Sequence, residues 1–342
     1  MGATVSPFWE ISSPYKKNFI CLPDRENISL ESQPEHFITL PLVSKNEDSV
    51  DLPLVMNVVI KYWGEDISPP ISCLATNRSA AMIHGIELAE TRGFSSYIYK
   101  GSMNDLKKRI DQGIPPIVIM PGIQNTVQHA MVISGYDSEE RRILTYVPEP
   151  DKMGAIPESK FEQDWEQDDM ISIIMVPSDM KDLLENENLK FVKSNRLCFE
   201  AEELREHGKL NEATVILQKA TEIDPDNAQA WSLLGGIYNE ANSEKAIPCY
   251  EKAIKLNTKY YLAYRGLGNY YLKKKNYSLA EAYYNQAITI NSMRFGPIYK
   301  NRAIARMELG NNKGAKEDLV KYLEQMPGAD DSKRIQEALH QF

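Results

Sequence analysis

The sequence predicts two successive parts: an α+β domain in the front half, then an all-α array of paired helices from about residue 190. Two observations lead to this expectation. The back half repeats its small and large residues with a period close to 34, which is typical of stacked helix pairs. The front half alternates helical patterns with short apolar runs of strand length, and a helix-first layout with later strands is typical of an α+β domain.

The front half contains recognisable start signals and apolar runs. A helix is expected to open at Asp51, because aspartate at the N-cap with Pro53 in the first turn is a helix-start signature. Further helices are expected over 78–92 and 103–112. The expected strands are 37–43, 97–99, 117–120, 130–134, 142–146 and 170–176.

Composition bounds the class of protein. The 342 residues suggest two or three domains. No apolar run approaches the ~20 residues of a membrane-spanning helix, and the first residues carry no secretory signal pattern. The four cysteines (Cys21, Cys73, Cys198 and Cys249) are scattered without metal-ligand spacing. We therefore expect a cytoplasmic protein with reduced thiols, no metal, no cofactor and no membrane contact.

The net charge of −9 is unevenly distributed. Residues 1–189 contain 16 Lys and Arg against 29 Asp and Glu, whereas residues 190–342 contain 23 against 19. The front half is too acidic, and the back half too weakly basic, for a nucleic-acid-binding surface. Proteins or peptides are the expected partners.

The repeats are visible in both helices of each pair. Four alanines recur at spacings of 33, 34 and 35 residues, namely Ala213, Ala246, Ala280 and Ala315. In the first helix, Trp231, Leu234, Gly235 and Tyr238 recur as Tyr264, Leu267, Gly268 and Tyr271. Small residues let two helices approach closely, and large ones fill the space between pairs. This pattern resembles the tetratricopeptide repeat (TPR) family, with four units over 190–330 and a capping helix over 331–342.

The TPR resemblance implies a concave groove lined by the first helices. Arg265 and Asn269 are four residues apart and share a helix face. Lys300 and Asn301 belong to the next unit. Together they resemble a clamp for a peptide's terminal carboxylate, although Asp331 stands where a further basic residue is expected. The alternative is a solvated polar face.

The front half contains a second set of motifs. An LPLV run is followed by a helix ending in KYWG, then by GIPP before a strand, and by the run HAMVISGYD from His129. Over residues 36–180 this order resembles the papain-like domain of bacteriocin-processing (double-glycine) cysteine peptidases. Residues 1–35 would be an N-terminal extension.

The resemblance assigns four catalytic positions. The nucleophile falls on Asp51, the oxyanion-hole glutamine on Lys45, the general base on His129 and the orienting residue on Val147. Only the histidine is retained, and losing a triad nucleophile costs on the order of 10⁶ in rate. The expectation is an inactive peptidase homologue, a pseudoenzyme. Asp51 paired with His129 would raise the histidine pKa.

Three readings of function remain. The leading one is a protein- or peptide-binding scaffold or adaptor. The second is a divergent cysteine peptidase or acyl-transfer enzyme that uses Cys21 or Cys73 and recruits substrate through the repeats, or a hydrolase in which Asp51 and His129 act as an acid/base pair. The third is self-assembly through the repeat array. The sequence leaves the oligomeric state open.

Overall fold

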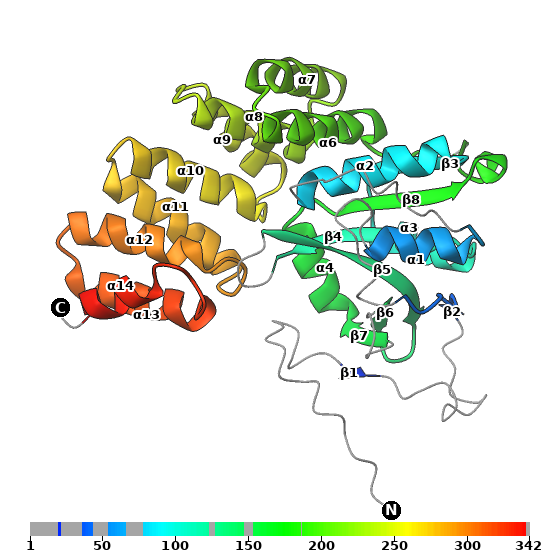
Figure 1. Cartoon of the computed structure of the whole chain (residues 1–342), viewed down its shortest axis with the longest axis horizontal. Helices are drawn as coiled ribbons and strands as arrows, with labels where there is room; N and C mark the ends of the chain where they lie inside the picture. Colours follow the sequence, from blue (N-terminus) through cyan, green and yellow to red (C-terminus); the bar gives the residue numbers. More distant parts are fainter. Residues whose placement is uncertain are drawn as a thin grey trace, which may run out of the picture. The chain divides into compact units, whose positions relative to one another are not determined.

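The computed structural model describes residues 20–21, 36–43, 54–65, 78–122, 127–146, 153–185 and 187–339 (Figure 1). It divides the chain into two compact units. The first consists of residues 1–119, 130–165 and 170–207, and the second of residues 120–129, 166–169 and 208–342. An α+β region is followed by a run of helices, as the sequence predicts.

The α+β region is built on one sheet. In the described part of the chain, the strand order is β1-β7-β6-β5-β4-β8-β3, and β2 pairs with β5. The strands are β1 (Ile20–Cys21), β2 (His36–Phe37), β3 (Phe94–Lys100), β4 (Ile117–Pro121), β5 (Gln128–Asp137), β6 (Arg142–Tyr146), β7 (Met153–Pro157) and β8 (Ile171–Pro177). The apolar runs of β4 and β8 are buried along almost their whole length, which is typical of central strands.

In the described residues, the helices that lie among the strands are α1 (Leu54–Tyr62), α2 (Arg78–Thr91), α3 (Met103–Asp111) and α4 (Glu158–Glu166). The start of α3 follows from a cap, because the Ser102 side chain accepts a hydrogen bond from the Asp105 N–H. The expected helices over 78–92 and 103–112 are confirmed. β7 and α4 were not predicted.

The expected strand over 37–43 is wrong in its extent. Only His36–Phe37 pairs with β5, where a Cβ on Gly135 would lie 2.5 Å from the His36 carbonyl oxygen. Farther along, the backbone N–H and carbonyl of Val43 form hydrogen bonds with a side chain and not with a neighbouring strand. Its N–H donates to the Tyr146 hydroxyl at 2.9 Å, and that hydroxyl donates to the Val43 carbonyl at 3.1 Å.

The helical run begins with α5 (Asp182–Glu185) and α6 (Val192–Glu206), both in the first unit. The second unit contains α7 (Leu210–Ile223), α8 (Ala228–Glu240), α9 (Ala246–Leu256), α10 (Tyr261–Lys273), α11 (Tyr277–Ile290), α12 (Pro297–Glu308), α13 (Asn312–Gln325) and α14 (Ser332–Leu339). Across the parts of the chain that the structure describes, no helix has the length and apolarity needed to cross a membrane.

Small residues set the spacing between these helices. The four repeated alanines are fully buried. A Cβ on Gly268 would lie 2.5 Å from the Tyr284 ring, so the glycine lets the two helices meet. At the end of the array, Ile335 and Leu339 of α14 pack against a buried cluster that contains Ala303 and Leu319. The helix therefore covers the last pair, as a cap must.

The lysine run at the end of α10 has a structural role. The Lys273 Nζ donates to the Asn239 carbonyl at 3.0 Å, and the Lys274 Nζ donates to the Asn242 carbonyl at 3.3 Å. The Asn239 carbonyl lies in the last turn of α8 and the Asn242 carbonyl in the turn that follows, where positive charge is favoured by the helix dipole. The lysines thus cap the helix of the preceding repeat.

Candidate functional site

Two of the expected groove residues meet in the second unit. Asn269 lies on α10 and Asn301 on α12. The Asn269 Oδ1 accepts a hydrogen bond from the Tyr284 hydroxyl at 2.8 Å and another from the Asn301 Nδ2 at 3.2 Å. The two asparagines are therefore brought together, as their spacing predicts, and Tyr284 fixes the orientation of the first.

Lys300 is already neutralised. Its Nζ lies 2.7 Å from the Asp331 Oδ2 and 5.1 Å from the centre of the Tyr322 ring. The Tyr322 hydroxyl donates to the same carboxylate at 2.7 Å. These two donors lower the pKa of Asp331. The residue that departs from the clamp pattern thus supplies an internal carboxylate for Lys300.

Arg265 differs from the other three candidates. Its guanidinium lies 4.9 Å from the centre of the Phe295 ring. Among the residues that the structure describes, it has no hydrogen-bond or ion-pair partner. Burial, with the nearby charge of Arg294, lowers the pKa of the guanidinium. The charge of Arg265 is close enough to Asp168 to lower the pKa of that carboxyl, but no carboxylate of the described residues accepts a hydrogen bond from this guanidinium. A largely desolvated cation without such a bond is a costly arrangement.

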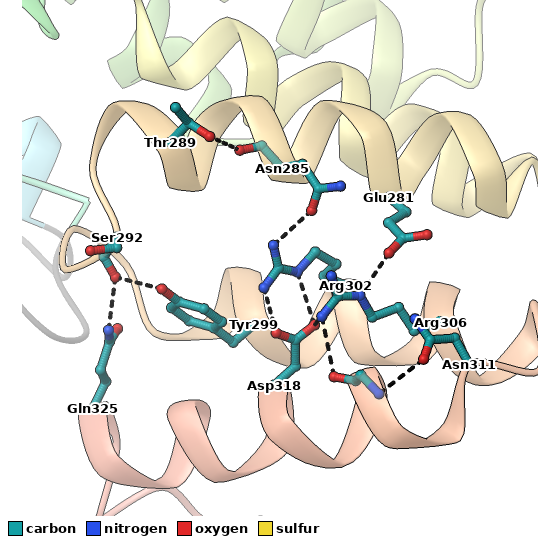
Figure 2. Close-up of polar contacts among 11 residues, drawn as sticks. Glu281, Asn285, Thr289, Ser292, Tyr299, Arg302, Arg306, Asn311, Asp318 and Gln325 are labelled. Atoms are coloured by element: carbon teal, nitrogen blue, oxygen red, sulfur yellow. Dashed lines mark hydrogen bonds and ion pairs between the residues drawn. The ribbon is translucent and has the colours of Figure 1, made fainter.

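In the neighbouring repeat, the largely buried arginines Arg302 and Arg306 are paired with carboxylates (Figure 2). Asp318 accepts from Arg302 at 2.9 and 2.5 Å and from Arg306 at 3.1 Å. Arg302 also donates to Asn285 at 2.7 Å, and Arg306 donates to Glu281 at 2.7 Å. Each guanidinium in this network therefore has a carboxylate within hydrogen-bond distance, in contrast to Arg265.

The second unit contains a buried ion pair that the sequence did not reveal. Arg294 and Asp168 are fully shielded and 2.5 Å apart. The same Asp168 oxygen accepts from the Gln128 Nε2 at 2.6 Å. Desolvation raises the pKa of Asp168, while Arg294 opposes the rise. Asp168 sits in an acidic stretch that has the composition of a solvated surface, so no sequence signal marked it.

The structure describes only some of the positions that the peptidase resemblance marks as catalytic. Lys45, Asp51, Val147 and Cys73 lie outside the described residues, as does the side chain of Cys21. The two described cysteines, Cys198 and Cys249, are buried. Burial raises the pKa of Cys249 to about 11, so its thiol stays protonated at neutral pH.

His129, near the start of β5, is neutral. Its Nδ1 lies 2.8 Å from the Pro121 carbonyl oxygen, which can only accept, so this nitrogen carries the proton. Burial lowers the pKa of His129 to about 4, and Arg294 contributes in the same direction. Desolvation therefore lowers this pKa, and the expected pairing with Asp51 stays a prediction, because Asp51 lies outside the described residues.

Comparisons with known proteins agree with both halves of this architecture. Residues 74–172 match the Peptidase_C39 like family. Residues 201–241 match a TPR repeat model and residues 238–292 a tetratricopeptide repeat model. The chain thus contains a Peptidase_C39-like domain followed by tetratricopeptide repeats. Lys45 and Asp51 precede the matched segment.

Similar solved structures include the MamA protein, at 26% identity over 41% of this chain and 76% of that one, with a TM-score of 0.36. PilF of Pseudomonas aeruginosa is 21% identical over 43% of this chain and 67% of that one, with a TM-score of 0.40. A thermophilic TPR protein in Thermus thermophilus, TTC0263, is 19% identical over 47% and 87%, with a TM-score of 0.39. A comparison with curated proteins found no match.

Proposed function

We propose that the protein is a peptide-binding scaffold whose repeat groove holds a ligand carboxylate at Arg265, and whose peptidase-like half does not cleave peptide bonds. The tetratricopeptide repeats support a protein-interaction role. The observation that carries the proposal is the guanidinium of Arg265, which has no acceptor among the described residues. The domain bounds that go with it are 36–180 and 190–330.

A carboxylate is the ligand group that best fits Arg265. A guanidinium binds a carboxylate through two parallel hydrogen bonds, and such charge-assisted bonds are among the strongest available. The Lys300 ammonium is paired with the Asp331 carboxylate, and the Asn301 amide donates to the Asn269 amide oxygen. Arg265 is therefore the group in this set with donors to spare, and a bound anion would recover the free energy that its burial costs.

The direct test compares matched peptide pools. Each random pool is prepared with a free terminal carboxylate and with a terminal amide, and retention on the full chain is measured by mass spectrometry. We expect the acid pool to be retained over the amide pool, and Arg265→Met to reduce that retention at least tenfold. Arg334→Met, at an exposed position of α14, is the matched control. Equal retention on wild type and Arg265→Met would refute the assignment.

The absence of peptidase activity is argued from His129. Cysteine peptidases need an imidazole that takes the thiol proton and stays charged beside the thiolate. A histidine with a pKa of about 4 and one nitrogen bonded to a backbone carbonyl is poorly suited to that role. We expect no hydrolysis of fluorogenic peptides by the purified chain at pH 5–8. Activity lost in His129→Asn would overturn this part.

One observation favours the enzyme alternative. The segment that matches the peptidase-like family begins at residue 74, directly after Cys73, and α2 follows from Arg78. If the Cys73 thiol lay at the start of α2, the helix dipole would lower its pKa. If peptide hydrolysis is detected, Cys73→Ser and alkylation of the native thiol decide whether Cys73 is the nucleophile.

The partner is proposed to be a protein or peptide, not nucleic acid or lipid, and the location cytoplasmic. The net charge of −9 supports this choice, because a phosphate backbone or an anionic membrane requires a basic surface. Binding of labelled single-stranded DNA or of anionic vesicles at 0.15 M salt would contradict it.

A further inference from the structure

The loops between successive repeats contain the same asparagine turn twice. Asn257 ends α9 and Asn291 ends α11, 34 residues later. In each case the side-chain Oδ1 accepts from the N–H two residues on, at 2.9 Å from Lys259 and 3.0 Å from Met293. These turns fix each side chain and leave the Nδ2 donors directed away from the turn.

Both asparagines donate to the same short segment, Glu166–Asp169, which belongs to the second unit. The Asn257 Nδ2 donates to the Glu166 carbonyl at 2.8 Å and to the Asp169 Oδ1 at 3.2 Å. The Asn291 Nδ2 donates to the Gln167 Oε1 at 3.1 Å. Equivalent residues of successive repeats therefore contact one short segment, the end of α4 and the turn that follows it.

Two cations beside these asparagines match the charge of the segment. The Lys259 Nζ lies 2.6 Å from the Glu166 carboxylate, and the Arg294 Nη2 lies 2.5 Å from Asp168. Arg294 also donates to the Gln167 carbonyl at 3.4 Å. The segment carries three acidic residues and is held by amide donors and basic groups, which is the chemistry of acidic-peptide recognition.

The backbone supports the view that these contacts hold the segment in place. Asp169 has a φ of 57°, in the left-handed region that non-glycine residues seldom adopt. Such a conformation costs about 1 kcal/mol or more and persists where surrounding contacts over-determine it. The turn after α4 is closed by the Asp169 N–H, which donates to the Glu166 carbonyl at 3.1 Å. Asn257 adds its bonds to that same carbonyl and to the Asp169 side chain.

We propose that Asn257, Lys259, Asn291 and Arg294 form an acidic-peptide-binding edge, and that the chain's own Glu166–Asp169 segment is its internal occupant. An external acidic peptide would compete with this segment. A tethered segment acts at an effective concentration on the order of millimolar, so the wild-type edge is closed to weak ligands. None of the four groove residues belongs to this edge.

Occupancy of the edge is linked to the segment that carries His129. Asp168 accepts from Gln128, and Arg294 donates to the Val127 carbonyl at 3.3 Å. If an external peptide replaced Asp168 on Arg294, Gln128 would lose its acceptor. Residues 127–129 would then report the exchange, and the His129 ring resonances are a suitable probe.

The first test opens the edge and supplies a ligand in trans. The full chain with Glu166→Gln and Asp168→Asn keeps the shape of the segment but removes two charges. We expect the labelled peptide acetyl-Glu-Gln-Asp-Asp-amide to bind this variant at least tenfold more tightly than wild type, by fluorescence anisotropy. The neutral acetyl-Gln-Gln-Asn-Asn-amide should bind neither. A folded variant that binds the acidic peptide no better than wild type would overturn the proposal.

The second test keeps the segment and changes the edge. Asn257→Asp with Asn291→Asp preserves the Oδ1 acceptors of both turns, removes the donors and adds repulsion. In the otherwise wild-type chain, we expect amide exchange over 166–169 to accelerate at least tenfold while α13 exchange is unchanged. Unchanged exchange over 166–169 would refute the proposal even if the opened variant failed to fold. Arg334→Met, at an exposed position of α14, is the control that should leave both readouts unaffected. Neither readout measures the carboxylate-dependent retention proposed for Arg265.

Discussion

Helices α10 and α12 occupy equivalent places in successive repeats, yet their shielded arginines are treated differently. Arg302 on α12 has Asp318 at 2.5 Å and Asn285 at 2.7 Å (Figure 2). Arg265 on α10 has an aromatic ring and no acceptor in the described part of the chain. The difference separates two uses of the same residue type: a cation with an internal carboxylate is part of the packing, whereas one without it is available to a ligand.

The strongest way to break this contrast is to give α12 an unpaired charge as well. Asp318→Ala leaves Arg302 without a carboxylate partner, whereas Arg306 keeps Glu281, and an uncompensated charge in a shielded position is strongly destabilising. We expect the free energy of unfolding to fall by about 3 kcal/mol in urea denaturation. Acetate at constant ionic strength should recover part of the loss. Asp330→Ala, at an exposed acidic residue, is the control.

A second prediction concerns the pH dependence of stability that follows from the lowered pKa of His129 in the second unit. His129 is neutral when folded, with a pKa of about 4 against 6.5 when unfolded. Between those values the unfolded chain binds the extra proton, so stability is full above about pH 6.5 and falls as the pH drops toward 4. The contribution is about 2–3 kcal/mol. His129→Asn keeps a donor for the Pro121 carbonyl and should flatten this part of the stability profile.

A third prediction sharpens the local geometry next to Arg265. A Cβ on Gly266 would lie 2.3 Å from the Tyr250 ring, whereas a Cβ on Gly236 meets only the Tyr250 hydroxyl at 3.9 Å. Gly266→Ala should therefore destabilise by about 1–3 kcal/mol through overpacking. Gly236→Ala should stabilise by about 0.5–1 kcal/mol, because alanine is the better helix former. Thermal unfolding of the two variants checks the pair, and equal effects would contradict it.

Periodic packing made the helical half predictable. Alanines at the repeat spacing are buried because two helices must approach there, and the same spacing located Asn269 and Asn301, which do meet. In the front half, apolar runs such as Ile117–Pro121 identified central strands. These features depend on the order of residue types along one element, which a sequence displays directly.

The remaining features depend on contacts between elements distant in sequence. The strand expected over 37–43 is limited to His36–Phe37, and the backbone of Val43 instead bonds the hydroxyl of Tyr146, over a hundred residues away. In the sequence, Asp331 departs from the pattern of a carboxylate clamp. In the structure, it is the ion-pair partner of Lys300. The pairing of Asp168 with Arg294, 126 residues apart, had no local signature. The roles of Lys45, Asp51 and Val147 stay predictions.

The smallest effect is expected at Lys300, the groove cation that has an internal partner. The Lys300–Asp331 pair is about one-third exposed on each side, and such pairs contribute 0–1 kcal/mol. Lys300→Ala should therefore change the free energy of unfolding by less than 1 kcal/mol and leave carboxylate-dependent peptide retention within about twofold. Asp331→Ala has the opposite consequence for binding, because it releases a cation next to Asn301. If Asp331→Ala increases retention of acid-terminated peptides and Lys300→Ala in the same chain cancels the increase, Asp331 limits the groove to one free cation. If neither variant changes retention, binding depends on Arg265 without Lys300.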